Sequence, residues 1–166
     1  MNETKQPEPA SKPIAYIDMD GTLVDFVSAF PKIDPAVLEA HADKDDIPGI
    51  FALMDPMPGA IEAVHALAPH YELYVLSTAP WKNPSAWSDK LEWIQRHFGA
   101  EEGTVFYKRV ILSHHKHLNR GALLIDDRPQ KSPGFVANGG EIIHFGPEGS
   151  HPTWQHVLDD LLARAR

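Results

Sequence analysis

The chain has 166 residues, of which 43% are apolar and 23% charged, as in an ordinary globular domain. It has no cysteine, which excludes disulfides, thiolate catalysis and cysteine-ligated zinc and fits a reducing, cytoplasmic location. The net charge of -8 disfavours a nucleic acid polymer or an anionic membrane as partner. Residues 82–131 differ, with nine Lys/Arg against six Asp/Glu, so this stretch is a candidate to line an anionic-ligand site.

The first third of the chain predicts a tail, a strand and an insertion. Residues 1–13 are polar and proline-rich, so we expect a disordered tail and no signal peptide. The apolar run Ile14–Ile17 predicts a buried strand that ends at a polar loop, 18–22. Prolines then interrupt the sequence, and we predict a small helical insertion at about 28–57.

The rest of the chain predicts alternating helices and strands. Helices are expected at Pro58–Ala68, Ser85–Phe98 and Pro152–Arg164, and strands at Tyr71–Leu76, within Val105–Leu112, at Ala122–Ile125 and at Glu141–Phe145. The apolar faces of the first two helices are assigned to Ile61, Val64, His65 and Ala68 and to Trp87, Leu91, Ile94 and Phe98. This alternation predicts a three-layer, Rossmann-like α/β sandwich with a parallel sheet, formed by residues 14–166 as one domain.

Acidic and hydroxyl residues follow three of the predicted strands. Asp18 and Asp20 follow the first, Ser77 and Thr78 the second, and Asp126 and Asp127 the fourth. Parallel strands bring their carboxyl ends to one edge of the sheet, where ligands bind. Four carboxylates crowded at one edge repel each other unless a cation intervenes, and their oxygen donors favour Mg²⁺.

These residues resemble the motifs of a known superfamily. The run 18–25 looks like the first motif of the haloacid dehalogenase superfamily of phosphohydrolases, 76–78 its second, Lys90 its third and 124–127 its fourth. Four further parts of the chain are similar to the 5'(3')-deoxyribonucleotidase family, the cytosolic type C 5'-nucleotidases: 77–82, 90–94 with 97–99, 110–113 with Lys116 after it, and 123–129. The resemblance covers roughly residues 14–30 and 71–135 and fails in 31–57.

The resemblance implies a Mg²⁺-dependent phosphomonoesterase. Mg²⁺ is expected on the Asp18 carboxylate, the Asp20 backbone carbonyl and the Asp126 carboxylate. Asp18 is then the nucleophile that forms an aspartyl-phosphate, and Asp20 is the acid and base. Lys90 is expected to bind the phosphoryl group. Asp127 holds either a metal-bound water or Lys90.

Further residues are candidates for binding the substrate. Ser77 or Thr78 is expected to contact phosphoryl oxygens, and Lys82 and Lys116 to contact phosphate or substrate, whereas Phe26 and Trp81 either stack on a nucleobase or simply pack. His114 stands where the family typically has an arginine, which leaves nucleotide specificity open. With His115 and His117 it also offers a weaker alternative, a zinc site.

The expected substrate is a small phosphorylated molecule, in the first place a (deoxy)nucleoside monophosphate. Alternatives are a phosphatase for another phosphorylated metabolite, a phospho-acceptor module like a receiver domain, and an inactive binding protein. Asp20 argues against the receiver, because a second acid/base speeds loss of the phosphate. The insertion is short for the cap that selects substrates in the superfamily. The oligomeric state is left open.

Overall fold

The computed structural model describes residues 11–119 and 123–166. Most of the predicted tail, residues 1–10, lies outside the described residues, as does Ala122. At the described end of that tail, the Lys12 ammonium donates to the carbonyl of Ala68, and the Pro13 carbonyl accepts from the N–H of Glu72. In the described ranges, no helix has the length and apolar character to cross a membrane.

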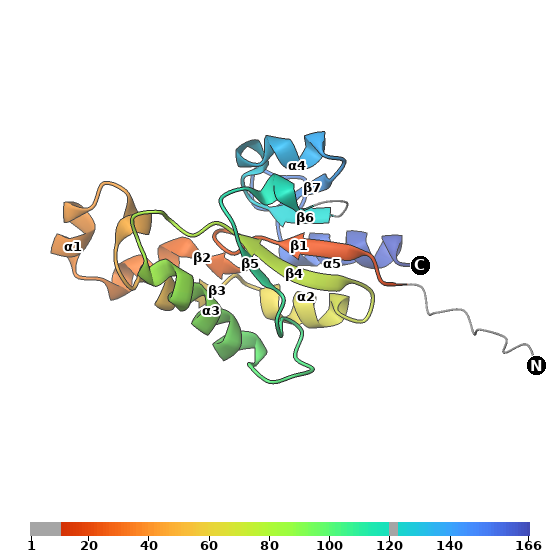
Figure 1. Ribbon diagram of the computed structural model, residues 1–166, viewed down its shortest axis with the longest axis horizontal. Helices are drawn as coiled ribbons and strands as arrows, with labels where there is room; N and C mark the ends of the chain where they lie inside the picture. The colour runs from red at the N-terminus through yellow and green to blue at the C-terminus, as the bar shows by residue number, and fades with distance from the viewer. Residues whose placement is uncertain (1–10, 120–122) are drawn as a thin grey trace, which may run out of the picture.

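A five-stranded parallel sheet forms the centre of the molecule (Figure 1). Its order is β5 (Val110–Leu112), β4 (Glu72–Ser77), β1 (Ile14–Ile17), β6 (Leu123–Asp126), β7 (Glu141–His144). Ile17 pairs with Val75 on one side and Ile125 on the other, so the three central strands end at the same edge of the sheet, with β4 continuing to Ser77. The predicted parallel α/β sandwich is confirmed, and the polar residues that follow these strands meet at one edge.

Helices cover both faces of the sheet, and β1 shows why, because alternate side chains of a strand point to opposite faces. Ala15 and Ile17 belong to the larger core, which includes side chains of α2 (Ala60–Leu67), α3 (Ser85–Phe98) and α5 (Trp154–Arg164). Tyr16 points the other way and joins a small cluster with Phe135 of α4 (Pro133–Ala137), a helix that the sequence analysis did not predict.

The buried faces of α2 and α3 agree with the predicted ones only in part. In α2 the buried side chains are Ala60, Ala63, Val64 and Leu67, and His65 is exposed. In α3, Trp87 and Leu91 are exposed, and the buried face is Ala86, Lys90, Trp93, Ile94 and Phe98. The prediction for α3 was right for Ile94 and Phe98 and wrong for Trp87 and Leu91. Lys90, a charged residue, points inward, and periodicity of apolar residues alone does not reveal an inward lysine.

The segment 28–57 folds as α1 (Pro35–Ala40) and three short 3-10 helices, Phe26–Lys32, Lys44–Asp46 and Ile50–Ala52. An antiparallel ribbon of β2 (Val24–Asp25) and β3 (Asp55–Pro56) forms its stem, which the sequence analysis missed. The segment lies beyond the carboxyl end of β1 (Figure 1). The buried Asn83 amide, just before α3, donates to the carbonyls of Asp45 (2.8 Å) and Ile47 (3.0 Å) and fixes the insertion to the main domain.

Candidate active site

Asp18 lies at the carboxyl end of β1, in the middle of the sheet. Its N–H donates to the carbonyl of Ile125 (2.9 Å), so pairing with β6 fixes its position. Its side chain is buried, and Oδ1 accepts from the N–H of Met19 (2.8 Å). Asp126 ends β6 in the equivalent place, where Oδ1 accepts from the N–H of Arg128 (2.8 Å). Both carboxylates are therefore held by backbone donors before any ligand binds.

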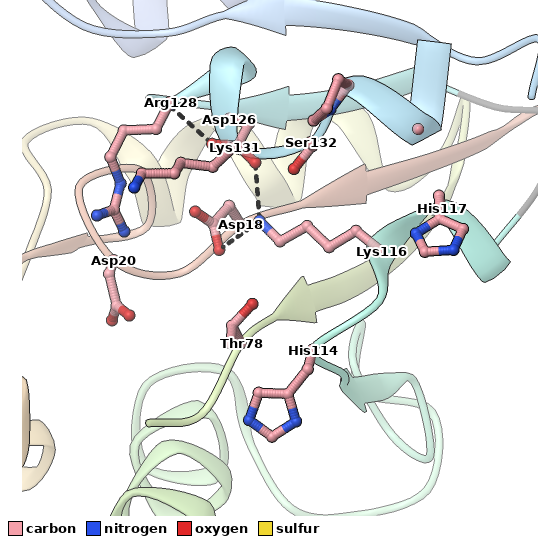
Figure 2. Close-up of a pocket in the computed structure, with 12 residues that line it drawn as sticks. Asp18, Asp20, Thr78, His114, Lys116, His117, Asp126, Arg128, Lys131 and Ser132 are labelled. Atoms are coloured by element: carbon pink, nitrogen blue, oxygen red, sulfur yellow. Dashed lines mark hydrogen bonds and ion pairs between the residues drawn. The ribbon is translucent and has the colours of Figure 1, made fainter. Parts of the chain in front are cut away.

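Lys116 joins these two carboxylates (Figure 2). Its Nζ lies 3.2 Å from Asp18 Oδ1 and 2.7 Å from Asp126 Oδ2. Burial raises the pKa of Asp18 to about 7, Lys116 opposes this, and the charges of Asp126 and Asp20 add to it. Burial lowers the pKa of Lys116, but the two carboxylates outweigh burial and raise it overall. Lys116 therefore stays charged and partly neutralises the acidic group.

Lys90 forms a second ion pair from α3. Its side chain is fully buried, and Nζ donates to Asp20 Oδ2 (2.7 Å), Ser77 Oγ (2.9 Å) and the carbonyl of Thr78 (2.5 Å). The ammonium also lies 4.6 Å from the centre of the Phe51 ring. Asp20, rather than Asp127, therefore orients Lys90. Asp20 Oδ1 is buried without a hydrogen-bond partner in the described chain.

Gly21 makes the turn after Asp20 possible. Its φ is +72°, which favours glycine, and a Cβ built there would lie 2.2 Å from Asp127 Oδ2. Gly21 therefore lets the loop after β1 approach the acidic residues that follow β6. The indole of Trp154 in α5 supports the same loop, since its Nε1–H donates to the carbonyl of Thr22 (2.8 Å).

We expect Gly21→Ala to be more destabilising than Gly49→Ala. Both positions have positive φ (+72° and +80°), so each substitution adds about 1–2 kcal/mol of backbone strain. Only Gly21 has an atom in the way, because a Cβ at Gly49 meets nothing within 4 Å. Thermal unfolding of the two variants measures the difference, and equal losses of stability would contradict the steric argument.

A pocket of about 380 Å³ opens over Asp18. Five of the predicted site residues line it: Asp18, Asp20, Thr78, Lys116 and Asp126. The remaining lining residues are His114, His117, Arg128, Lys131, Ser132, Pro133 and Gly134 (Figure 2). The structure thus brings the acidic residues together with several cationic ones in a single hollow.

Other predicted residues lie outside this lining. Ser77 and Lys90 are buried behind it, and Ser77 Oγ accepts from Lys90 instead of facing the pocket. Lys82 and Trp81 are exposed on the loop between β4 and α3. The ring of Phe26 packs against Phe30 and Phe51. Of the two hydroxyl residues at the carboxyl end of β4, Ser77 and Thr78, only Thr78 faces the pocket.

Sequence reasoning missed Lys131 and Ser132, and it considered His117 only for a zinc site; these three residues come from the loops before β6 and after it. Lys131 falls in the stretch 82–131, whose positive charge was the one sequence signal for this wall. No pattern singled out Ser132, although its side chain is buried and its hydroxyl points into the hollow (Figure 2).

The acidic residues have the composition of a site for a hard cation. Asp18, Asp126 and Asp127 each offer a carboxylate oxygen, and these oxygens lie within 4.8 Å of one another. Asp127 Oδ1 is buried without a hydrogen bond, and Arg128 Nε is 3.8 Å away. An all-oxygen donor set with an unsatisfied buried oxygen suits Mg²⁺ or Ca²⁺. Across the described ranges this is the only such group, and His114, His115 and His117 do not form one.

Comparison with known proteins agrees with this arrangement. Solved haloacid dehalogenase-like hydrolases from Streptococcus pneumoniae (TM-score 0.54, 16% identity) and Xanthomonas campestris (TM-score 0.55, 14% identity) share the fold. The alignments cover 93% of this chain in both cases, and 99% and 98% of those chains. These likenesses show that the chain has the fold of haloacid dehalogenase-like hydrolases, with its acidic residues at the carboxyl edge of the sheet.

Sequence comparison narrows the class. Residues 42–166 match the family model "5' nucleotidase, deoxy (Pyrimidine), cytosolic type C protein". A protein of Vibrio phage KVP40 that bears a provisional 5'(3')-deoxyribonucleotidase name is 48% identical over 90% of this chain and 85% of its own length. The human cytosolic-type 5'(3')-deoxyribonucleotidase is 25% identical over 86% of this chain and 70% of its own. The chain belongs to this deoxyribonucleotidase family and is a phosphoric monoester hydrolase.

Proposed function

We propose that this chain hydrolyses deoxynucleoside monophosphates through an aspartyl-phosphate on Asp18, with Mg²⁺ as cofactor. The observation that carries the proposal is the buried Asp18 carboxylate, which lines a pocket together with Asp20, Asp126 and Lys116. The names of the phage and human relatives support a nucleotide as substrate. The name of the human relative also supports a cytoplasmic place of action.

Asp18 acts first in this mechanism. One of its carboxylate oxygens attacks phosphorus, a P–O bond to Asp18 forms, and the ester P–O bond breaks. The carboxylates of Asp18, Asp126 and Asp127 and the backbone carbonyl of Asp20 would hold Mg²⁺, which would supply positive charge to the phosphoryl group. Lys116 adds a fixed positive charge on the same side and holds the Asp18 carboxylate in place.

Asp20 supplies and removes the protons. Lys90 fixes its Oδ2, so Oδ1, which has no partner in the described chain, is the atom that exchanges protons. Oδ1–H protonates the departing alkoxide of the nucleoside. The resulting carboxylate then takes a proton from the water that attacks phosphorus, and the bond to Asp18 breaks to release inorganic phosphate.

The remaining residues bind the substrate. Thr78 faces the pocket, and we assign it to a phosphoryl oxygen; its Oγ1–H donates to the carbonyl of Ser113 (3.2 Å) in this structure and would turn to the phosphoryl oxygen of a bound substrate. Ser77 and Lys90 support it from behind, and Lys82 lies further out on the same loop. We include the insertion at about 28–57 as a cap on the single domain 14–166, with Asn83 limiting its motion.

A phosphate-release screen tests this function. The full chain is assayed with Mg²⁺ against deoxynucleoside monophosphates, ribonucleoside monophosphates and sugar phosphates. We expect repeated turnover of deoxynucleotides and loss of that turnover on chelation, with recovery when Mg²⁺ is returned. Hydrolysis of sugar phosphates but of no nucleotide would refute the assignment of a nucleotide substrate. Release of only one phosphate per chain would refute the assignment of an enzymatic function.

A further inference from the structure

Ser132 has an unused hydroxyl that faces the pocket. Only 7% of the residue is exposed, and Figure 2 shows the hydroxyl directed into the hollow above Asp18. Its N–H donates to the carbonyl of Pro129 (3.0 Å), and its carbonyl accepts from the N–H of Phe135 (3.1 Å). The backbone of Ser132 is therefore fixed, whereas its hydroxyl has no hydrogen-bond partner within the described parts of the chain.

The usual structural role of a serine at this position is not taken. Ser132 precedes α4 as its N-cap residue, and a serine there ordinarily accepts a hydrogen bond from the N–H two or three residues further on. Ser132 makes no such bond. Packing of Phe135 against Tyr16 (6.1 Å between ring centres) and a hydrogen bond from Asn138 Nδ2 to the carbonyl of His117 (2.8 Å) hold α4 instead. A buried polar group without a partner calls for an explanation, and a ligand in the pocket supplies one.

Lys131, the preceding residue, is a cation without a carboxylate partner. Among the lysines and arginines of the lining, Lys116 is paired with two carboxylates, and Arg128 Nε lies 3.8 Å from Asp127 Oδ1. Lys131 forms no ion pair with any described residue. The side chains of Lys131 and Arg128 both extend toward the Asp20 side of the pocket (Figure 2). Two cations facing one hollow repel each other, and an anion bound between them relieves this repulsion.

The Ser132 hydroxyl is placed to reach the group that Asp18 attacks. In Figure 2 the hydroxyls of Thr78 and Ser132 lie on opposite sides of the Asp18 carboxylate. A phosphoryl group over Asp18 presents its non-bridging oxygens to the walls of the pocket. Thr78 meets these oxygens from one wall, so the opposite wall needs a donor and positive charge of its own. Ser132 and Lys131 are the donor and the cation on that wall.

We propose that Ser132 and Lys131 form a second phosphoryl-binding arm, on the wall of the pocket opposite Thr78. The proposal rests on the proposed function, because the phosphoryl group is that of the substrate. The Ser132 hydroxyl donates to a non-bridging oxygen, and the Lys131 ammonium balances part of the negative charge. A hydrogen bond to an ionised oxygen is stronger than one between neutral groups, and the fixed backbone of Ser132 keeps the donor in place.

The first test compares two substrates that share only the phosphoryl group, a deoxynucleoside monophosphate and 4-nitrophenyl phosphate. We expect kcat/KM to fall about tenfold in Ser132→Ala and in Lys131→Met, with both substrates alike. Lys131→Arg keeps the positive charge and should recover most of the loss. A fall with the deoxynucleotide alone would place these two side chains against the nucleoside and overturn the proposal.

The second test measures binding of inorganic phosphate without turnover. A ligand that binds the folded protein raises its melting temperature, and in the presence of Mg²⁺ this rise should be smaller in Ser132→Ala and Lys131→Met than in the parent. Without phosphate, Ser132→Ala should melt no lower than the parent, because it loses only an unpaired hydroxyl. A lower melting temperature of Ser132→Ala with an undiminished effect of phosphate would assign Ser132 a structural role and overturn the proposal.

Ser88→Ala and Lys108→Met are the matched controls, since they make the same chemical changes at exposed positions outside the pocket lining. Both should keep the kcat/KM and the phosphate binding of the parent. Weaker phosphate binding in Ser132→Ala and Lys131→Met, together with no hydrolysis of deoxynucleotides by the parent, would support the arm and refute the proposed function. Turnover of deoxynucleotides with unchanged kcat/KM and phosphate binding in both variants would refute the arm alone.

Discussion

The Asp18→Asn variant is expected to release phosphate at least about four orders of magnitude more slowly than the parent. The amide that replaces the carboxylate has no negative charge and is a poor nucleophile toward phosphorus. Phosphate release from a deoxynucleoside monophosphate at saturating Mg²⁺, measured against protein-free background, gives the comparison. Retention of full activity would show that another group attacks phosphorus.

The same variant should be folded, and its stability provides the control. The pKa of Asp18 is about 7 in the folded protein, against an ordinary value of 3.8, because of burial. The folded metal-free parent therefore holds a proton that the unfolded chain loses, so its stability falls as pH rises from about 4 to about 7. Asp18→Asn lacks this dependence. The melting temperature of Asp18→Asn minus that of the parent should therefore be larger at pH 8 than at pH 5.

The sequence was enough to predict the sheet and its acidic edge. The strands β1 and β4 are short β-prone runs followed directly by polar residues, and parallel pairing leaves few ways to arrange them. Asp18 and Asp126 could be placed together because each follows a central strand. The family resemblance, now confirmed by comparison, rests on the same strand ends.

The two lysines show where this reasoning stops. The sequence analysis assigned Lys90 to the phosphoryl group, whereas in the structure Lys90 is buried outside the pocket lining and pairs with Asp20. Lys116, considered only as a possible substrate contact, is the lysine between Asp18 and Asp126. Lys90 lies far along the chain from Asp20, and Lys116 lies far from Asp18. Local patterns of charge carry no information on which distant carboxylate a long side chain will reach.

Loops limited the prediction in the same way. The pocket wall with Lys131 and Ser132 comes from a short 3-10 helix, Pro129–Lys131, and the turn before α4. The stem β2–β3 consists of two residues per strand. Such elements span no more than one period of a hydrophobic pattern, so tertiary contacts decide them.

The second large effect is expected in Asp20→Asn. An amide at this position neither protonates the leaving group nor activates water, so turnover of a deoxynucleotide should fall by about 10²- to 10⁴-fold. Replacement of an exposed carboxylate in the insertion, Asp43→Asn, makes the same chemical change away from the strand edge and should leave turnover close to the parent value.

The choice of leaving group separates the two roles of Asp20. The 4-nitrophenolate anion departs without a proton, so attack by Asp18 on 4-nitrophenyl phosphate should survive in Asp20→Asn. Hydrolysis of the aspartyl-phosphate still needs a base, and the variant should therefore show a burst of about one nitrophenolate per chain and then slow turnover. Because Lys90 fixes only Oδ2, both roles fall to Oδ1. Equal losses on both substrates without a burst would mean that Asp20 serves the site only through its pairing with Lys90.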